Sequence, residues 1–356
     1  MIFIIWCVFG LLHLAITAYL SMAFRKYTPA NNLKRPKLSV IIAAHDEEEN
    51  LKRLIPAILS QKYPDFEIVV ALDRTTDNSK YHLADCDKVI PIVINEVPAD
   101  WNQKKYALNE AIKHASGEWL VFTDADCKPA SDKWLTSLVK QADDQTSIVL
   151  GVSPYQIGHS FLSGYISFES FMTAFAYIGR ALHKKPYMGV GRNMMVRRSF
   201  FKRMGGYEKI KNIHGGDDDL FIQQHANKSN LSIVLGQDAL VWTYPKKSWK
   251  AYFLQKIRHL SVGTTYKNRD QLFLGVWHTT HLVFFLLLFF NASQSFFWPM
   301  LLFYLFIKLV SYRFAASKIG THINYMLLPL VDMLYAVLTP VIALWSKLVK
   351  DIPWKN

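Results

Sequence analysis

Two aspartates at the end of an apolar segment are the first residues in this sequence that could do chemistry. Asp124 and Asp126 follow the run Trp-Leu-Val-Phe at 119–122, which predicts a buried strand. Residues two apart in an extended chain point to the same side, so both carboxylates face one point of solvent. Such a pair favours a hard divalent metal that keeps water ligands and bridges to a substrate phosphate. Because a lone Asp-x-Asp is common by chance, this prediction depends on the neighbouring motifs.

Acidic residues also follow two earlier apolar segments. The segment at 38–43 predicts a strand that leads into acids at 46–49, where negative charge also suits the N-terminus of the following helix. The segment at 66–72 predicts a strand that ends at Asp73. Alternatively, Asp73 only belongs to a turn, because the residues after it include further Asp and Asn side chains, which favour turns. Ligands of open α/β sheets bind at the carboxyl ends of the strands. Acids at three such ends therefore favour one binding site.

A further group of acids, Asp217 to Asp219, precedes the helical pattern at 221–226. One aspartate at a helix N-terminus is ordinary, but three in a row exceed what a cap needs. Mutual repulsion raises the pKa of at least one of these carboxyls. A raised pKa is what a general base near neutral pH requires.

The elements that must position these residues form an α/β domain between 36 and 271. Apolar strand patterns alternate there with amphipathic helical patterns, as is typical of an α/β layer fold. The predicted strands are 38–43, 66–72, 119–123 and 148–152, and the predicted helices are 47–61, 104–115 and 132–142.

Apolar segments at both ends of the chain predict membrane-spanning helices. Residues 1–24 carry almost no charge and are long enough to cross a bilayer. Arg25 and Lys26 follow them, which places the α/β domain in the cytoplasm by the positive-inside rule. The region 272–349 holds two to three further spans, because its last stretch, 325–345, fits a kinked span or a re-entrant or interfacial hairpin.

The side of the C-terminus stays open on the sequence. If each apolar stretch crosses the membrane fully, counting the spans from an outside N-terminus puts the C-terminus outside as well. Lys347, Lys350 and Lys355 favour the inside. The net charge of +13 is explained by basic flanks beside anionic lipid headgroups, so no nucleic-acid partner is expected. The three cysteines form neither a disulfide framework nor a zinc motif. The sequence also lacks a G-x-G-x-x-G after its first strand and a P-loop, which argues against dehydrogenases and P-loop enzymes.

Six short motifs, in this order, resemble those of family 2 inverting glycosyltransferases, and in particular the membrane-bound synthases of bacterial polysaccharides and glycolipids. The resemblance covers residues 38–258. The motifs are the strand and helix opening at 38–51, Asp73-x-x-x-Asp77-Asn78, Lys104 with Ala107-Leu108-Asn109, Thr123-Asp124-Ala125-Asp126-Cys127, Gly216-Asp217-Asp218-Asp219-Leu220 and Gln255-x-x-Arg258.

The resemblance implies a GT-A fold, which is a nucleotide-sugar-binding mixed sheet flanked by helices, here with N-terminal and C-terminal transmembrane helices. It implies a divalent metal, Mg²⁺ or Mn²⁺, held by Asp126 together with Asp124. It also implies a nucleotide-sugar donor, most commonly a UDP-sugar. The residues that the resemblance places at the donor are Ala43, His45, Glu47, Asp73, Lys104, Asp124, Gln255 and Arg258.

Transfer with inversion needs a carboxylate that takes a proton from the acceptor hydroxyl. Read as Gly-Asp-Asp, the acid motif makes Asp218 this catalytic base; aligned on Leu220, it makes Asp217 the base. The residues expected to contact the acceptor are Gly191, Asn193 and His259.

These features predict a membrane-bound inverting glycosyltransferase of hexosyl- or N-acetylhexosaminyl-transferase type. We expect a multi-pass protein of the inner (plasma) membrane, in contact with its lipids, whose catalytic domain is cytoplasmic. The acceptor would be a hydroxyl of a cell-envelope glycan or a lipid-linked acceptor, reached beside an interfacial helix at 161–177. His259 stands where the family's motif usually has Trp, which argues against long processive synthesis.

Two alternatives stay open. The first is a polyprenyl-phosphate sugar transferase, against which the acid motif at Asp217 and Asp218 counts, because a phosphate acceptor needs no base. The second is a catalytically inactive membrane scaffold that keeps the fold.

Overall fold

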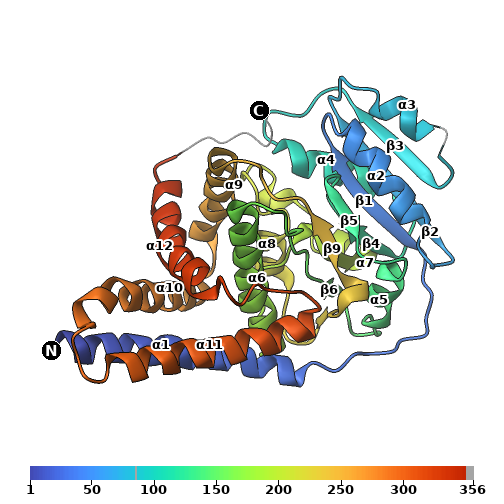
Figure 1. Cartoon of the computed structure of the whole chain (residues 1–356). Helices are drawn as coiled ribbons and strands as arrows, with labels where there is room; N and C mark the ends of the chain where they lie inside the picture. The colour runs from blue at the N-terminus through green and yellow to red at the C-terminus, as the bar shows by residue number, and fades with distance from the viewer. Residues whose placement is uncertain (85, 350–356) are drawn as a thin grey trace. The chain divides into compact units, whose positions relative to one another are not determined.

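The described residues, 1–84 and 86–349, form two compact units in the computed structural model (Figure 1). The first unit combines Met1–Tyr27, Ile157–His183 and the described chain from Pro245 onward. The second combines Thr28–Gln156 with Lys184–Tyr244. The boundaries 1–24, 36–271 and 272–349 stay predictions, and Lys350 and Lys355 lie outside the described residues.

The second unit is built on a mixed sheet, as predicted. Its strand order in the described chain is β3-β2-β1-β4-β7-β6-β8, and the neighbours from β3 to β4 run parallel while β7 is antiparallel to both β4 and β6. These strands are β1 (Leu38–Ala44), β2 (Phe66–Asp73), β3 (Val89–Ile94), β4 (Trp119–Phe122), β6 (Ile148–Leu150), β7 (Met194–Arg197) and β8 (Leu231–Ile233). A separate antiparallel pair joins β5 (Cys127–Pro129) to β9 (Val241–Thr243).

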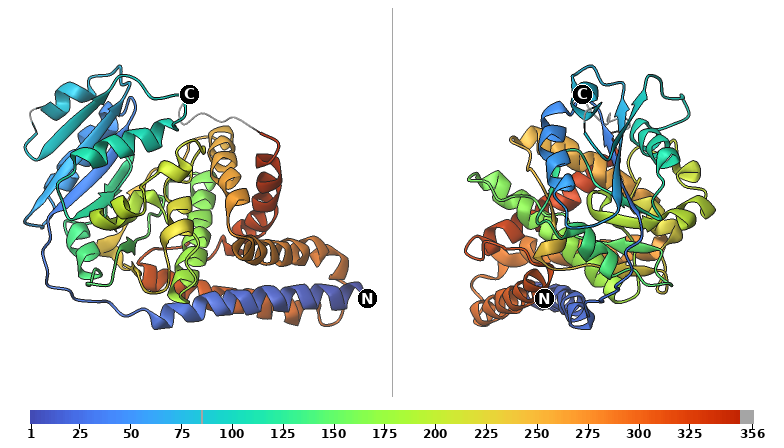
Figure 2. Two further views of the ribbon diagram at one scale, coloured as in Figure 1. Left: turned by 180° about the vertical axis from the view of Figure 1, so that it is seen from behind. Right: turned by 90° about the vertical axis from the view of Figure 1, so that its right-hand side faces the viewer.

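Helices cover both faces of the central strands, which explains why every residue of β1, β2 and β4 is buried (Figure 2). Val40 and Ile42 point to the face that packs against Leu54 and Leu135. The helices of this unit are α2 (Glu48–Leu59), α3 (Ser79–Ala84), α4 (Gln103–His114), α5 (Trp134–Lys140), α7 (Arg198–Arg203) and α8 (Asp219–His225), of which α4 contacts β1 and β2.

The carboxyl ends of the three central parallel strands meet at one edge. Ile41 pairs with both Val69 and Phe122, so this register aligns β1, β2 and β4 with one another. Asp73 is the last residue of β2, and Asp124 lies two residues beyond the end of β4. The register thus brings two of the predicted strand-end acids to the same edge.

The amino-terminal side of the same strands holds a buried carboxylate that serves stability. Glu67 Oε1 accepts hydrogen bonds of 2.6 Å from the Ser39 hydroxyl and the Ser116 amide. Glu67 Oε2 accepts a hydrogen bond of 2.6 Å from the Ser116 hydroxyl and lies 3.3 Å from Lys37 Nζ. Burial opposes ionisation of Glu67, but these donors outweigh it and lower its pKa to about 2.

We expect Glu67→Gln to destabilise the protein by about 1–2 kcal/mol at pH 7. The pKa of Glu67 in the folded state is below its unfolded value of about 4.3, so its contribution is complete above that value and is lost as the pH falls toward 2. Thermal unfolding of wild type and variant between pH 7 and about 3 measures this difference. An equal difference at both ends of the range would show that Glu67 stabilises through shape rather than charge.

The first unit is helical throughout its main elements. They are α1 (Ile2–Ala23), α6 (Phe161–Leu182), α9 (Trp249–Ser261), α10 (Asn268–Leu288), α11 (Phe297–Ile319) and α12 (Leu328–Ser346). Helix α1 contacts α6, α10 and α11, while α12 contacts α9 and α10.

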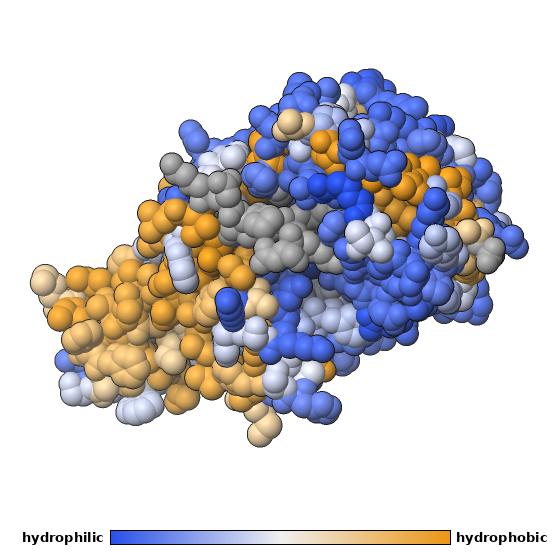
Figure 3. Space-filling model, turned by 90° about the horizontal axis from the view of Figure 1, so that it is seen from above, coloured by the Kyte–Doolittle hydropathy of each residue, from blue (hydrophilic) through white to orange (hydrophobic). Residues whose placement is uncertain are grey.

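Four stretches of the described chain are helical, long and apolar enough to cross a membrane: Ile2–Lys26, Asn268–Asn291, Phe297–Ile319 and Leu328–Ser346. Apolar side chains gather on the surface of these helices (Figure 3), among them Leu11, Phe306 and Leu344. The hairpin alternative for 325–345 is wrong, because α12 continues through Pro340 as one helix.

Helix α6 corrects one prediction. Most of its side chains are buried, including Tyr165, Phe175 and Arg180, so it packs inside the protein instead of lying along a membrane surface. The serines that make its sequence look interfacial, such as Ser163 and Ser167, are buried as well.

Candidate active site

A partly buried lysine joins two of the predicted acidic motifs. Lys104, on the first turn of α4, places its Nζ 3.0 Å from Asp124 Oδ1 and 3.0 Å from Asp217 Oδ2. Burial disfavours the charged amine, but Asp124, Asp217 and Asp218 outweigh this cost and raise the pKa of Lys104 well above its usual value. The lysine is therefore a fixed positive charge between two carboxylates from distant parts of the chain.

The loop that carries the acids is tied to α4 by the next residue. Lys105 Nζ donates hydrogen bonds to the carbonyls of Ile213 and Gly215. Gly215 and Gly216 have φ values of 72° and 71°, a left-handed conformation that glycine adopts without strain. These contacts fix Asp217 next to Lys104, and Lys105 is a site-building residue that the sequence analysis missed.

Asp217 and Asp218 have opposite electrostatic environments. Burial opposes ionisation of Asp217, but Lys104 and Lys105 outweigh it and hold its pKa below the usual value. Burial and the neighbouring Asp217 raise the pKa of Asp218. This divergence between two adjacent carboxyls is the pattern by which enzymes separate acid–base roles.

Asp218 is held by backbone donors on both oxygens. Its Oδ2 accepts from the Gly191 amide at 2.6 Å, and its Oδ1 accepts from the Asp219 amide at 2.8 Å, at the start of α8. A Cβ atom at Gly191 would lie 3.3 Å from Asp218 Oδ2. Glycine at 191 therefore permits the close approach of backbone and carboxylate, which places this predicted residue beside the acids.

Arg192 is a second partly buried cation at the site, and the sequence analysis did not single it out. Its Nη1 lies 3.3 Å from the Tyr155 hydroxyl, and its guanidinium lies 5.2 Å from the centroid of the Tyr155 ring. Burial lowers its pKa, but Tyr155, Cys127, Asp124 and Asp126 raise it by more, so the net pKa is above the usual value. An arginine directly after Gly-Val-Gly is the signal that could have found it.

The Asp124 and Asp126 carboxylates fit a divalent metal whose remaining ligands would come from a substrate diphosphate. Both residues are partly exposed at the sheet edge, and Cys127 Sγ lies 3.7 Å from Asp126 Oδ1. Within residues 1–84 and 86–349, no group of three or more His, Cys, Asp or Glu side chains gathers around one point. Mg²⁺ and Mn²⁺ prefer oxygen ligands, and Mg²⁺ is commonly held by one or two carboxylates plus substrate phosphates.

The Asp73 carboxylate is not exposed to solvent and is paired with Arg74. It is fully buried, and its two oxygens accept from Arg74 Nε at 2.9 Å and Arg74 Nη2 at 3.0 Å. His45 Nδ1 lies 2.6 Å from the Asp73 carbonyl oxygen, and Asp46 Oδ1 accepts from the Thr76 amide at 2.7 Å. The ends of β1 and β2 are thus joined into one surface, on which Arg74 covers the carboxylate predicted to meet the donor.

The other predicted donor and acceptor residues fall into two groups. Ala43 lies near the end of β1 and Glu47 directly precedes α2, both in the second unit. Gln255, Arg258 and His259 lie on α9 in the first unit. The roles of all five stay predictions.

Asn193 is a structural residue in this fold. Its side chain is fully buried, and its Nδ2 donates to the carbonyls of Val152 and Ala239, each at 2.8 Å. Its Oδ1 accepts from Trp134 Nε1 at 2.9 Å. Because the amide joins three segments of the protein, we withdraw the expectation that Asn193 contacts an acceptor.

Comparisons with known proteins concern the family and the fold of the chain. A family model described as "Glycosyl transferase family 2" matches residues 39–205, and one described as "Glycosyl transferase family group 2" matches residues 135–345, more than half of the chain. "Probable glycosyltransferase YdaM" of Bacillus subtilis (strain 168) is 25% identical over 248 residues, which are 67% of this chain and 58% of the relative. "4,4'-diaponeurosporenoate glycosyltransferase" of Staphylococcus aureus (strain N315) is 26% identical over 147 residues, 41% of this chain and 39% of the relative.

The chain therefore spans roughly two to three fifths of the length of these curated relatives. A solved structure of mannosyltransferase PcManGT from Pyrobaculum calidifontis, in complex with GDP-Man and Mn²⁺, superposes with a TM-score of 0.60 at 18% identity. It covers 96% of this chain and 99% of the other, and at that identity the likeness concerns the fold. Taken with the matched family models, these findings show that the chain belongs to glycosyltransferase family 2 and has a GT-A-type fold.

Proposed function

We propose that this glycosyltransferase moves a sugar, with inversion, from a nucleoside-diphosphate sugar to a hydroxyl of a cell-envelope glycan or lipid-linked acceptor. The observation that carries the proposal is the cluster in which Lys104 joins Asp124 to Asp217, with Asp218 beside it. It combines fixed cations for a departing diphosphate with a carboxyl suited to act as a base.

The donor would lie at the carboxyl edge of the sheet, near Asp124 and Asp126. A divalent metal held there by these carboxylates would supply a Lewis acid for the diphosphate oxygens. Lys104 and Arg192 place two further positive charges beside Asp124, and they would stabilise the negative charge that the diphosphate gains as it leaves. That charge grows during the reaction, so both cations favour the transition state over the bound donor.

In the transfer step, a carboxylate removes the proton from the acceptor hydroxyl while that oxygen forms a bond to the anomeric carbon of the sugar. The bond from this carbon to the diphosphate breaks, and its electron pair leaves with the nucleoside diphosphate. We place Asp218 first as the base because burial and Asp217 raise its pKa, whereas Lys104 keeps Asp217 ionised and paired. Asp217 is the alternative.

The membrane setting supports a lipid-linked or envelope acceptor. Four helical stretches of the described chain can cross a bilayer, and the basic residues after the first one favour a cytoplasmic catalytic unit in the plasma membrane. Nucleotide sugars are then available on the side where the carboxyl edge lies. We expect a UDP-sugar as donor.

The full chain, purified in detergent or nanodiscs, should release nucleoside diphosphate from one member of a panel of UDP- and GDP-sugars when Mg²⁺ or Mn²⁺ is present. Radiolabelled donor and a membrane-lipid extract should then yield a labelled product with an inverted anomeric linkage. Absence of turnover with every donor and acceptor fraction would favour the inactive scaffold.

Asp126→Ala tests the metal assignment. We expect turnover to fall by at least about 100-fold, because the lost metal contact contributes several kcal/mol to stabilising the diphosphate. Binding of Mn²⁺ in the presence of nucleoside diphosphate, followed by electron paramagnetic resonance, should weaken in parallel. Asp144→Ala is the control, since Asp144 is an exposed aspartate of the same unit. Unchanged turnover in Asp126→Ala would exclude this residue as the ligand.

A further inference from the structure

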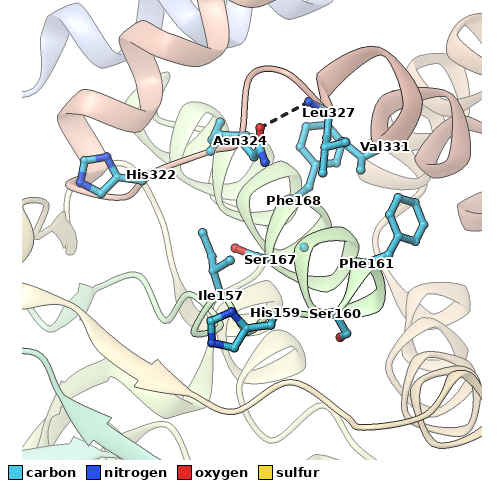
Figure 4. Close-up of a pocket in the computed structure, with 13 residues that line it drawn as sticks. Ile157, His159, Ser160, Phe161, Ser167, Phe168, His322, Asn324, Leu327 and Val331 are labelled. Carbon is cyan, nitrogen blue, oxygen red and sulfur yellow. Dashed lines mark hydrogen bonds between the residues drawn. The ribbon is translucent and has the colours of Figure 1, made fainter.

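A pocket of about 330 Å³ lies within the first unit, whereas the acids described above belong to the second unit (Figure 4). It opens between the chain that enters α6 and the loop that joins α11 to α12. Ligand pockets in proteins begin at about 300 Å³, so it can hold a small head group and part of a chain.

The lining of this pocket is divided by polarity. His159, Ser160 and His322 supply polar groups, while Phe168 and Val331 supply an apolar wall. Among the described residues that line it, none is acidic. A ligand that fits both parts is amphiphilic, and the lining offers an anion no repulsion.

A buried hydroxyl faces the pocket. Ser167 on α6 is 7% exposed, and no hydrogen bond is found for its hydroxyl among the residues that the structure describes. Figure 4 shows this hydroxyl on the side of Ile157, inside the ring of lining residues. A hydroxyl that faces the pocket and has no partner among the described residues of the protein is free to hydrogen-bond a ligand there.

Donors for a negative charge also line this pocket. The 22-residue helix α6 begins at Phe161, on the pocket wall, and the N-terminus of a helix carries partial positive charge. Asn324 Oδ1 accepts from the Met326 and Leu327 amides at 3.1 and 3.4 Å, which leaves its NH₂ group as a donor.

The pocket lies at one end of two candidate membrane spans. Helix α11 ends at Ile319 and α12 begins at Leu328, so the connection that lines the pocket is short and stays close to both helix ends. If these helices cross the bilayer, the pocket is at the level of the lipid head groups. Phospholipids reach this level with a phosphate beside an apolar chain.

We propose that this pocket binds one membrane phospholipid, with its phosphate among His159, His322, Asn324 and the start of α6, and its chain against Phe168 and Val331. The inference does not depend on which sugar or acceptor the enzyme uses. Its test is a binding measurement that requires no glycosyl transfer.

Gly164→Leu is the deciding variant. Gly164 lines the pocket from within α6, and a Cβ atom there would meet nothing within 4 Å, so a leucine fills the space without a clash and favours the helix. Gly275→Leu is the matched control, because Gly275 is a helical glycine of α10 that also has nothing within 4 Å of its added Cβ and does not line the pocket.

The delipidated full chain is titrated with phosphatidylglycerol in detergent and observed by native mass spectrometry. Wild type and Gly275→Leu should bind one lipid with the same affinity, while Gly164→Leu should lose that affinity by at least about tenfold. His159→Ala combined with His322→Ala keeps the apolar wall, and we expect it to weaken binding by about tenfold or more through lost hydrogen bonds to the phosphate.

Two further ligands identify what is recognised. Diacylglycerol with the same chains lacks the phosphate and should bind at least about tenfold more weakly, and inorganic phosphate at millimolar concentration should not displace the phospholipid. Equal affinity of Gly164→Leu and wild type would overturn the proposal. Equal binding of diacylglycerol would overturn phosphate recognition, and displacement by inorganic phosphate would assign the pocket to a free anion instead of a lipid.

Discussion

Replacing Asp218 with asparagine is expected to lower kcat for sugar transfer by about 10²- to 10⁴-fold, the usual contribution of a general base. Donor affinity should stay close to that of the wild type, because Asp218 is held by the Gly191 and Asp219 amides and not by the cations of the donor edge. Single-turnover transfer and equilibrium binding of the nucleoside diphosphate measure the two quantities separately. Asp238→Asn, at an exposed aspartate paired with Lys133, controls for loss of charge in the same unit.

The companion variant Asp217→Asn should keep measurable transfer and change its pH dependence. Ionised Asp217 helps to raise the pKa of Asp218, so removing its charge lowers the pKa of the base. Activity requires the ionised base and falls as the pH drops through this pKa, so the acidic limb of the rate profile should move to lower pH in Asp217→Asn. If Asp217→Asn abolishes transfer while Asp218→Asn retains it, the base is Asp217.

A second large effect is expected in the helices of the first unit, at a buried charge pair. Lys308 Nζ on α11 lies 2.7 and 2.6 Å from the two Asp332 oxygens on α12, and both residues are 1% exposed. His281 on α10 completes the cluster, with Nε2 2.9 Å from Lys308 Nζ and 3.2 Å from Asp332 Oδ2. Charges inside membrane-spanning helices are costly unless they are paired in this way.

Either Lys308→Met or Asp332→Leu alone should destabilise the protein by about 3–5 kcal/mol, because each leaves one buried charge without its partner. The double variant should recover much of this loss, since it removes both charges and supplies apolar side chains of similar size. Thermal unfolding in detergent, followed by size-exclusion chromatography, measures the series. Lys318→Met, at an exposed lysine of the same helix, is the control.

A double variant no more stable than the single ones would contradict this account. It would indicate that the cluster of Lys308, Asp332 and His281 holds the helices through its hydrogen-bond geometry, and not merely through mutual neutralisation of its charges. The variants affect a different unit from the Asp218 series, so the two predictions fail independently.

Local patterns in the sequence identified most of the elements and the acids at the carboxyl edge. Continuous apolar runs predicted β1, β2 and β4, and the helical period predicted α2 and α4 to within a few residues. Hydropathy likewise predicted the first membrane span and the C-terminal helical region. These features depend on neighbouring residues, and for that reason one sequence is sufficient to find them.

The wrong predictions for Asn193 and for α6 both concern burial. The periodicity of a sequence does not show how many neighbours surround a side chain in the folded protein. The glycines before Asn193 suggested that it contacts a ligand. In the structure its side chain is buried and forms hydrogen bonds with Trp134, Val152 and Ala239. Helix α6 reads as interfacial because it contains serines, but Ser163 and Ser167 are covered by other parts of the protein.

The sequence by itself determined the family motifs, the strands β1, β2, β4 and β6 and the strand-end position of Asp124 and Asp126. Only the tertiary structure brought Lys104 between Asp124 and Asp217, and Lys308 to Asp332, since these partners come from separate elements. The physical reason is that a charge placed in a buried site must find its counter-charge through the folded chain. Nothing in the local sequence of a residue specifies which distant residue will supply that charge.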